Sequence, residues 1–217
     1  MDDSRCQGQA ETSNRALWGE MARVHIGTYR KVQLLRRGEE ILDPVELREL
    51  GDVRGKTMLH LQCHTGTDTL AWARRGAVVT GVDFSGQAIA CAERLRDELG
   101  LEARFLESNV YDLRVVLDEK FDVVYTSRGV LCWLRDLNAW ARIVAHFLKP
   151  GGCSTLSIPT RSATRSRNVR QGSRPSFTAG FTKRSRWCTH LTRRTRDAAR
   201  RRWGVVVQAR EPARRRK

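Results

Sequence analysis

Residues 57–83 read TMLHLQCHTGTDTLAWARRGAVVTGVD, and the hydrophobic period changes twice along this stretch. The apolar run Thr57–Cys63 predicts a buried strand, and Thr67–Arg75 predicts a helix. Ala77–Asp83 predicts a second strand, which ends in a carboxylate. A strand, a helix and a strand at this spacing are typical of a βαβ unit, whose two strands lie parallel in one sheet.

The same alternation continues toward the C-terminus. Ser85–Leu99 predicts an amphipathic helix with Ser85 as its N-cap. A further helix is expected over Leu137–Leu148, ended by the turn Lys149-Pro150-Gly151-Gly152, and further strands over Ala103–Glu107, Phe121–Thr126 and Cys153–Ile158. The sequence therefore predicts an α/β fold with five parallel strands covered by helices on both faces. We expect the strand that begins at Thr57 to be central and the strand that begins at Ala103 to lie at an edge.

The segment before Thr57 has helical character. Residues 14–37 predict one or two helices that stop at Gly38, and residues 44–50 predict a short helix with Pro44 in its first turn. We therefore divide the chain into an N-terminal helical segment over 1–40, an α/β domain over 41–160 and a tail over 161–217.

The net charge of +16 is confined to the tail. Residues 1–160 hold 21 Lys+Arg and 22 Asp+Glu, whereas residues 161–217 hold 19 Lys+Arg and only 2 Asp+Glu. The six cysteines show no zinc spacing and are expected to be reduced, and His60, His64 and His146 do not form a metal set. The polar start, without a signal peptide or a membrane-length apolar run, predicts a cytoplasmic protein that does not associate with membranes.

Two features at the ends of the first two strands indicate a nucleoside site. The turn Gln62–Gly66 precedes a helix, so its backbone can approach a ligand, although a plain strand-to-helix turn would read the same way. Asp83 can accept hydrogen bonds from both hydroxyls of a ribose, or it can simply cap the helix that starts near Ser85. A turn and an acid about 20 residues apart favour the nucleoside.

The stretch LHLQCHTGTDTLAWARRGAVVTGVDFSGQAI resembles the cofactor-binding half of class I S-adenosylmethionine-dependent methyltransferases of the small-molecule type. Phe121–Tyr125 resembles the fourth strand of that family, and LKPGG at 148–152 resembles the turn before its fifth. The resemblance covers roughly residues 14–159. It implies a Rossmann-like sheet, S-adenosyl-L-methionine as the cofactor and a small-molecule methyl acceptor.

The resemblance also implies residue roles. Cys63, His64 and Gly66 would cradle the methionine part of the cofactor, and Asp83 would hold its ribose. The remaining contacts would be Phe84 beside the adenine, Asn109 and Val110 at the adenine edge, and Ser127 at the methionine end. Tyr29 would contribute from the helical segment 1–40, which folds over the cofactor as a lid in related enzymes.

Several positions depart from the family pattern. Gln62 and His64 replace two glycines of the usual turn, which we interpret as an HLQCHxG variant, and His60 stands where an acid is common. Arg128 stands where a smaller or aromatic residue is expected. Trp18 is expected to pack in the lid, and Trp133 either lines the acceptor pocket or packs in the core. No residue is nominated as a catalytic base.

The tail does not continue the expected fold, and only Trp203–Ala209 resembles a strand. It is either a genuine arginine-rich extension that binds nucleic acid or acidic partners, or the translation of a wrong reading frame. Codons for Cys153–Ser166 can be chosen so that the frame two bases on reads FYFVDPHPLGDTI, which resembles the family's continuation and favours the frameshift.

Two functions follow from these alternatives. The first is a small-molecule methyltransferase whose truncated C-terminal part leaves the fifth strand as an exposed edge, with weak cofactor binding and little or no activity. The second is a nucleic-acid-binding protein that uses the basic tail and keeps the α/β domain as a scaffold.

Overall fold

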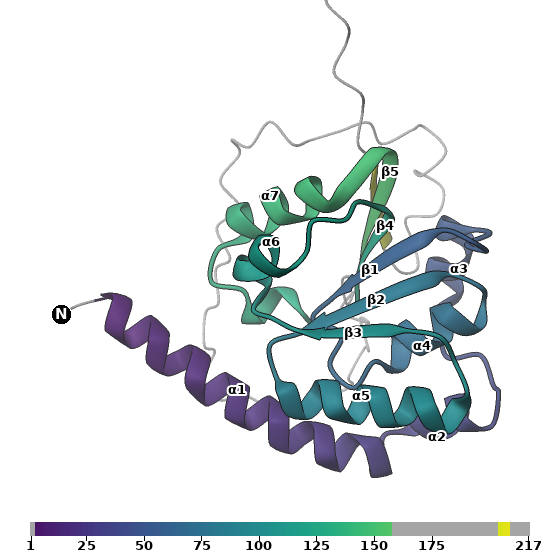
Figure 1. Cartoon of the computed structure of the whole chain (residues 1–217), viewed down its shortest axis with the longest axis horizontal. Coiled ribbons are helices and arrows are strands. Elements are labelled where there is room, and N and C mark those ends of the chain that lie inside the picture. The colour runs from purple at the N-terminus through teal and green to yellow at the C-terminus, as the bar shows by residue number, and fades with distance from the viewer. Residues whose placement is uncertain (1–2, 158–203, 209–217) are drawn as a thin grey trace, which may run out of the picture. The chain divides into compact units, whose positions relative to one another are not determined.

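The computed structural model describes residues 3–157 and 204–208, which form one sheet flanked by helices (Figure 1). The strand order is β3-β2-β1-β4-β5-β6. The first five strands run parallel, and β6 runs antiparallel to β5. The strands are β1 Thr57–Leu61, β2 Val78–Asp83, β3 Arg104–Glu107, β4 Phe121–Thr126, β5 Leu148–Ser157 and β6 Gly204–Gln208. The predicted central position of β1 and the edge position of β3 are therefore confirmed.

The helices begin and end close to the residues expected from the sequence. Their bounds are α1 Asp3–Thr28, α2 Arg30–Arg36, α3 Pro44–Leu50, α4 Thr67–Arg74, α5 Gly86–Leu99, α6 Leu113–Val116 and α7 Leu137–Phe147, with 3-10 turns η1 Val110–Asp112 and η2 Leu131–Trp133. The caps explain several starts. Ser85 caps α5 by accepting a hydrogen bond from the backbone N–H of Ala88, and Asp43 caps α3, which has proline in its first turn.

The sheet separates two hydrophobic cores, because alternate residues of each strand point to opposite faces. Met58 and Val123 belong to the core under α2, α4 and α5, whereas Leu59 and Val124 belong to the core under α6 and α7. Figure 1 shows these helices on the two sides of the sheet. Burial on both faces accounts for the nearly continuous apolar runs of the central strands.

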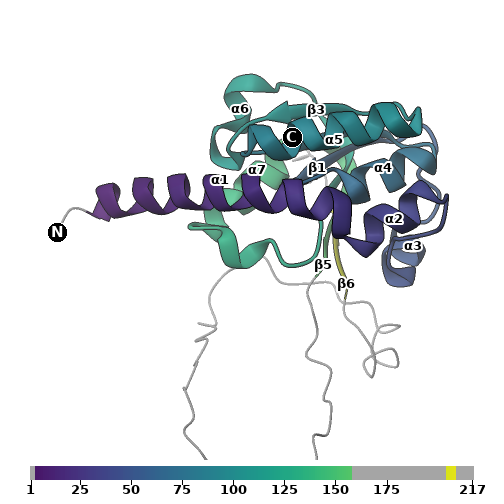
Figure 2. The ribbon, with the colours of Figure 1, turned by 90° about the horizontal axis from the view of Figure 1, so that it is seen from below.

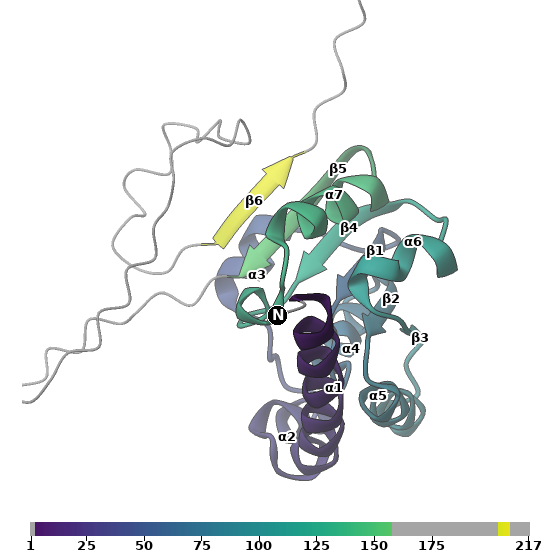
Figure 3. The same ribbon diagram turned by 90° about the vertical axis from the view of Figure 1, so that its left-hand side faces the viewer.

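Helix α1 packs against α5 and α2, whereas α2 contributes to the core on one face of the sheet. Helix α1 lies alongside α5 and α2 (Figures 2 and 3), and the small buried side chains of Ala22, Ala88 and Cys91 let α1 and α5 approach closely. The chain leaves helical geometry at Tyr29, with φ −72° and ψ 123°, which separates α1 from α2. The sequence predicted one or two helices over residues 14–37, and the structure has two, although α1 begins at Asp3, well before residue 14.

The LKPGG segment differs from its predicted role as a turn, because β5 starts at Leu148, directly after α7. Phe121 pairs with Leu148 and Val123 with Cys153, so the extra residues of β5 bulge out of the ladder. Gly151 accommodates the bulge with φ +78°. Asp122 stabilises it by accepting a hydrogen bond from Lys149 Nζ at 3.0 Å.

The expectation of an exposed fifth strand is wrong. Strand β6 covers β5 as an antiparallel neighbour, with Thr155 opposite Val206, and Figure 3 shows it in yellow at that edge. The β-branched run Val205–Val207 explains why this short segment pairs. The remainder of 161–217 lies outside the described residues, as do the predictions of its disorder and frameshifted origin.

The described residues include one histidine that is buried in the core without a charge partner. His60 of β1 is 1% exposed, its Nδ1 lies 2.7 Å from Thr69 Oγ1, and its ring packs against Tyr125 at 4.7 Å between centroids. Burial lowers the pKa of His60 to about 4. None of the helices in this part of the chain has the length and apolarity that a membrane span requires.

His60 should make stability depend on pH. Its pKa is about 4 in the folded protein against 6.5 ordinarily, so between these values the unfolded chain binds a proton that the folded chain does not. The contribution of His60 to the free energy of unfolding should therefore fall as the pH decreases through this window, by about 1.4 kcal/mol per pH unit. Replacing His60 with Gln should remove this contribution, measured by urea denaturation across the window. The matched variant His146→Gln should keep most of the slope. Equal slopes for wild type and His60→Gln would contradict the assignment.

Candidate functional site

The turn after β1 has an unusual backbone for its sequence. Gln62, His64 and Gly66 all have positive φ, at 50°, 51° and 67°. Only glycine adopts this left-handed region freely, and other residues lose roughly 1–2 kcal/mol there. Gln62 and His64 therefore adopt a backbone conformation typical of glycine while carrying side chains.

Gly66 itself cannot carry a side chain. A Cβ at this position would lie 2.6 Å from the Phe105 ring and 2.8 Å from Ala92 Cβ. The start of α4 is therefore packed tightly against α5 and β3. Gly66 is the N-cap of α4 and contributes no side-chain cap, so the first N–H groups of the helix face the turn.

Asp83 connects the backbone segments that follow β1 and β2. Its Oδ2 accepts a hydrogen bond from the backbone N–H of His64 at 2.8 Å, and its Oδ1 accepts one from the N–H of Ser85 at 3.0 Å. The residue is 5% exposed, and burial raises the pKa of Asp83 to about 6, although its hydrogen bonds to backbone N–H groups oppose the shift. Because Ser85 provides the cap of α5, Asp83 is more than a helix cap.

The other predicted cofactor residues lie at the same edge of the sheet, with one exception. Phe84 and Ser127 are half-buried after β2 and β4, and Val110 is buried after β3. Asn109 caps η1, because its Oδ1 accepts a hydrogen bond from the N–H of Tyr111 at 3.1 Å. Tyr29 is the exception, since it lies at the junction of α1 and α2 and is 46% exposed.

The side chains of Cys63 and Arg128 are both engaged within the protein, Cys63 by burial and Arg128 by an ion pair. The Cys63 side chain is buried, and burial raises the pKa of its thiol well above the ordinary value. The Arg128 guanidinium lies 2.5 Å from Asp43 Oδ2 at the start of α3. Arg128 is larger than the residue expected at its position, and this ion pair accounts for where its side chain lies.

A cluster of rings connects α1 with this turn, and it was not predicted from the sequence. His25 Nδ1 lies 3.0 Å from His64 Nε2, and the Trp18 ring contacts the His64 ring edge-on at 5.2 Å. Trp18 also contacts Trp133, which follows β4, at 5.1 Å. Residues 18, 25 and 29 are separated by seven and four positions, a spacing that places side chains on one face of a continuous helix. The sequence therefore did contain a signal that these rings could cluster.

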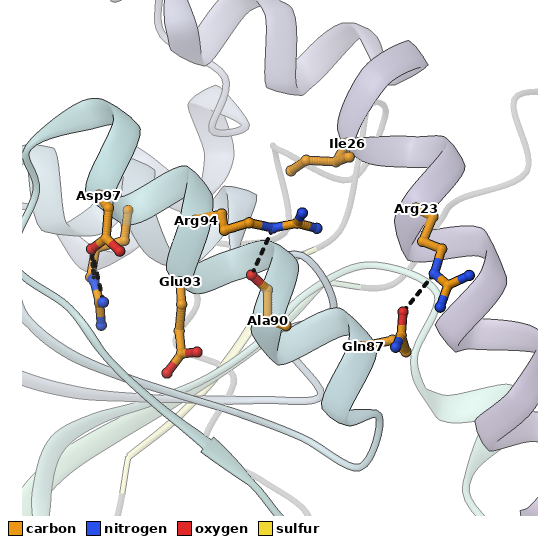
Figure 4. A pocket seen from close by; sticks show the side chains of 8 residues that line it. Arg23, Ile26, Gln87, Ala90, Glu93, Arg94 and Asp97 are labelled. Carbon is orange, nitrogen blue, oxygen red and sulfur yellow. Dashed lines mark hydrogen bonds and ion pairs between the residues drawn. The ribbon is translucent and has the colours of Figure 1, made fainter.

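A separate groove of about 840 Å³ lies between α1 and α5 (Figure 4). Its lining is mostly charged, and Arg23 crosses it to donate a hydrogen bond to Gln87 at 2.6 Å. None of the predicted cofactor residues lines it. Among residues 3–157 and 204–208, no three His, Cys, Asp or Glu side chains gather as metal ligands would.

Comparisons with known proteins place this site in a family context. Residues 59–154 match the family described as "Methyltransferase domain". The ubiquinone biosynthesis O-methyltransferase of Pseudomonas syringae pv. tomato is 33% identical over 104 residues, 48% of this chain and 44% of that protein. The cypemycin N-terminal methyltransferase of a Streptomyces species is 36% identical over 105 residues, 47% of this chain and 41% of that protein. The chain thus spans less than half the length of these relatives.

A solved structure agrees on the fold. The DhpI–SAH complex has a TM-score of 0.54 and 24% identity, and the match covers 75% of this chain and 76% of that one. The strand order, the sequence match and the relatives' names agree with one another. Residues 59–154 thus match the model of a methyltransferase domain, and the described residues have the Rossmann-like fold that the DhpI–SAH complex also has.

Proposed function

We propose that this chain binds S-adenosyl-L-methionine and transfers its methyl group to a small-molecule acceptor. The buried carboxylate of Asp83, at the end of β2 and bonded to the turn after β1, is the observation that carries the proposal. The names of the two relatives support methyl transfer. We further propose that HLQCHxG is a branch variant of the family's cofactor turn.

The residues at this edge fit that cofactor. The carboxylate of Asp83 accepts the backbone N–H groups of His64 and Ser85, with a further one from Phe84, and a carboxylate has about four acceptor positions, so Asp83 can also receive a ribose hydroxyl. The backbone of Cys63, His64 and Gly66 can approach the methionine part, because the first N–H groups of α4 have no side-chain cap and face this turn. Phe84, Asn109 and Val110 would border the adenine, Ser127 the methionine end, and Tyr29 the lid side.

The chemistry is a displacement that depends on alignment. When bound, S-adenosylmethionine supplies a methyl group on a positively charged sulfur. The chain's contribution is to hold the acceptor in line with that methyl group and to keep water away, which can account for several kcal/mol of the barrier. Trp18 and Trp133 lie above the turn and are placed to exclude water.

Removing the charge of Asp83 should weaken cofactor binding. Isothermal titration with S-adenosylhomocysteine should show a loss of about 1.5–3 kcal/mol for Asp83→Asn, roughly ten- to hundredfold in Kd, because a charge-assisted contact to the ribose is lost. Asp118→Asn, an exposed acid outside the site, should bind as the wild type does. Thermal denaturation of each variant checks that the fold survives. Equal affinity for wild type and Asp83→Asn would exclude the ribose role.

Cofactor affinity should also depend on pH. Since the pKa of Asp83 is about 6 in the free protein and the ribose requires the carboxylate, affinity for S-adenosylhomocysteine should increase from about pH 5 to pH 7 and then level off. The increase should approach tenfold per unit below the pKa. The dependence should be absent in Asp83→Asn. A wild-type affinity that is constant over this range would show that the ligand does not contact Asp83.

The charge of the tail supports a second candidate, nucleic-acid binding through residues 161–217, which hold 19 Lys+Arg and 2 Asp+Glu. The near-neutral remainder of the chain would then act as a scaffold. Such binding rests on counterion release and weakens steeply as the salt concentration increases.

The two candidates respond differently to loss of the tail charge. Replacing the arginines of residues 161–202 with serine removes most of the charge and keeps β6, which pairs with β5. We expect S-adenosylhomocysteine affinity to be unchanged and binding to a short RNA at 100 mM salt, measured by fluorescence anisotropy, to disappear. RNA binding that is insensitive to salt or survives the replacement would exclude the tail as the binding element.

A further inference from the structure

A second cavity, of about 290 Å³, lies between α6 and α7, the helices that cover one face of the sheet (Figure 1). Its lining comes from η1, α6, the loop before α7 and the first two turns of α7. None of the predicted cofactor residues lines it. The cavity is therefore separate from the proposed cofactor site.

The charged side chains of the lining are mostly positive. Three of them are the arginines Arg114, Arg135 and Arg142, and the only acid among the lining residues is Asp136. Asp136 is the N-cap of α7, and its Oδ1 accepts hydrogen bonds from two backbone N–H groups at the start of that helix, at 2.8 and 2.9 Å. The one carboxylate of the cavity is thus engaged with the backbone rather than with an arginine.

Two of the arginines have no carboxylate partner. Arg114 on α6 and Arg142 on α7 are exposed, and neither makes a hydrogen bond or an ion pair with another residue of the ranges 3–157 and 204–208. Other arginines in these ranges do pair, such as Arg54 with Asp52 at 2.7 Å. Two unpaired guanidinium groups that line one cavity repel each other, and an anion bound between them relieves this repulsion.

The third arginine holds a wall of the cavity in place. The Arg135 guanidinium lies 4.7 Å from the centroid of the Tyr111 ring and pairs with Glu11 of α1 at 2.8 Å. The Tyr111 hydroxyl donates a hydrogen bond to the backbone oxygen of Asp136 at 3.2 Å and accepts one from its N–H at 2.9 Å. Because Arg135 is already paired, the other two arginines are the groups that can bind an anion.

Apolar side chains complete the lining. Ala139, Arg142 and Ile143 share one face of α7 by their spacing of three and four residues. Ile143 is 6% exposed, and Tyr111 is half-buried against the same core. Cavities of roughly 300 Å³ and above are typical sites for small molecules. The cavity thus offers an apolar wall beside two cationic groups, which suits an anion that carries a carbon skeleton.

The number of guanidinium groups favours phosphate over carboxylate. A phosphate monoester carries roughly two negative charges at neutral pH and has three terminal oxygens, so it can accept hydrogen bonds from two arginines at once. A carboxylate has a single charge and two oxygens, which one guanidinium satisfies in bidentate fashion.

We infer that the cavity between α6 and α7 binds a small phosphate ester, with Arg114 and Arg142 on the phosphate group and Tyr111 and Ile143 against its organic part. This inference goes beyond the proposed function and does not depend on methyl transfer.

The test follows arginine modification residue by residue, because the 19 Lys+Arg of residues 161–217 dominate any measurement of total anion binding. The full chain is treated with phenylglyoxal, which modifies arginines, and the modified positions are identified by mass spectrometry of peptides. Arg114 and Arg142 should react readily, and phenyl phosphate should slow their modification. Arg94, an exposed arginine of the groove between α1 and α5, should react equally with and without phenyl phosphate.

Substitutions test the two assigned contacts. Arg114→Gln and Arg142→Gln should each increase, by about tenfold or more, the phenyl phosphate concentration that gives half-maximal protection of the remaining arginine, because a charge-assisted contact is lost. The matched variant Arg94→Gln should leave this concentration unchanged. Benzoate and inorganic phosphate should protect only at higher concentrations, since the first lacks a charge and the second lacks the organic part.

Each outcome bears on the inference separately from methyl transfer. Slowing of Arg94 and the tail arginines to the same extent as Arg114 would show general anion association and overturn the inference, as would protection of neither Arg114 nor Arg142. Benzoate or inorganic phosphate acting at the concentration of phenyl phosphate would overturn the assignment to a phosphate ester. S-adenosylhomocysteine affinity should be unchanged in both variants, and its loss would show that the cavity is part of the cofactor site.

Discussion

The site depends on one carboxylate that bonds two backbone amides from different turns. Asp83 accepts hydrogen bonds from His64 after β1 and from Ser85 at the start of α5. Because β1 and β2 are parallel neighbours, both turns lie at the same edge of the sheet, and these two bonds fix the position of one turn relative to the other. The left-handed residues of the first turn need such support, since each loses of the order of 1 kcal/mol relative to its preferred backbone. The hydrogen bond from His64 to Asp83 therefore fixes where the His64 ring lies and where α4 begins.

Local features of the chain could be predicted from the sequence, whereas non-local pairings could not. The parallel sheet followed from apolar runs that alternate with helical periods, and the Ser85 cap from residues within one turn. The bond between His25 and His64 joins positions 39 residues apart and depends on how α1 crosses α5. The pairing of β6 with β5 depends on two segments far apart in the chain, so sequence reasoning left β5 uncovered. The LKPGG segment was misjudged because glycine marks a bulge and a turn alike.

The turn after β1 shows why a departure in residue type need not be a departure in structure. A pattern of glycines records where the backbone takes positive φ, and histidine is one of the residues that tolerates this region better than most. Gln62 and His64 have φ values of 50° and 51°, so both residues occupy the left-handed region that glycine favours. Position 66 does not allow the same exchange, because the Phe105 ring fills the space that a side chain would need.

A side chain at position 64 also joins two parts that a glycine there would leave independent. The backbone of His64 belongs to the turn, whereas its ring contacts Trp18 and His25 of α1. Docking of α1 and the conformation of the turn therefore share one free-energy coupling, and thermodynamic linkage makes that coupling reciprocal. Any ligand that orders the turn favours the docked helix by the same amount that the docked helix favours the ligand. The N-terminal helix thus becomes a reporter of what the turn holds.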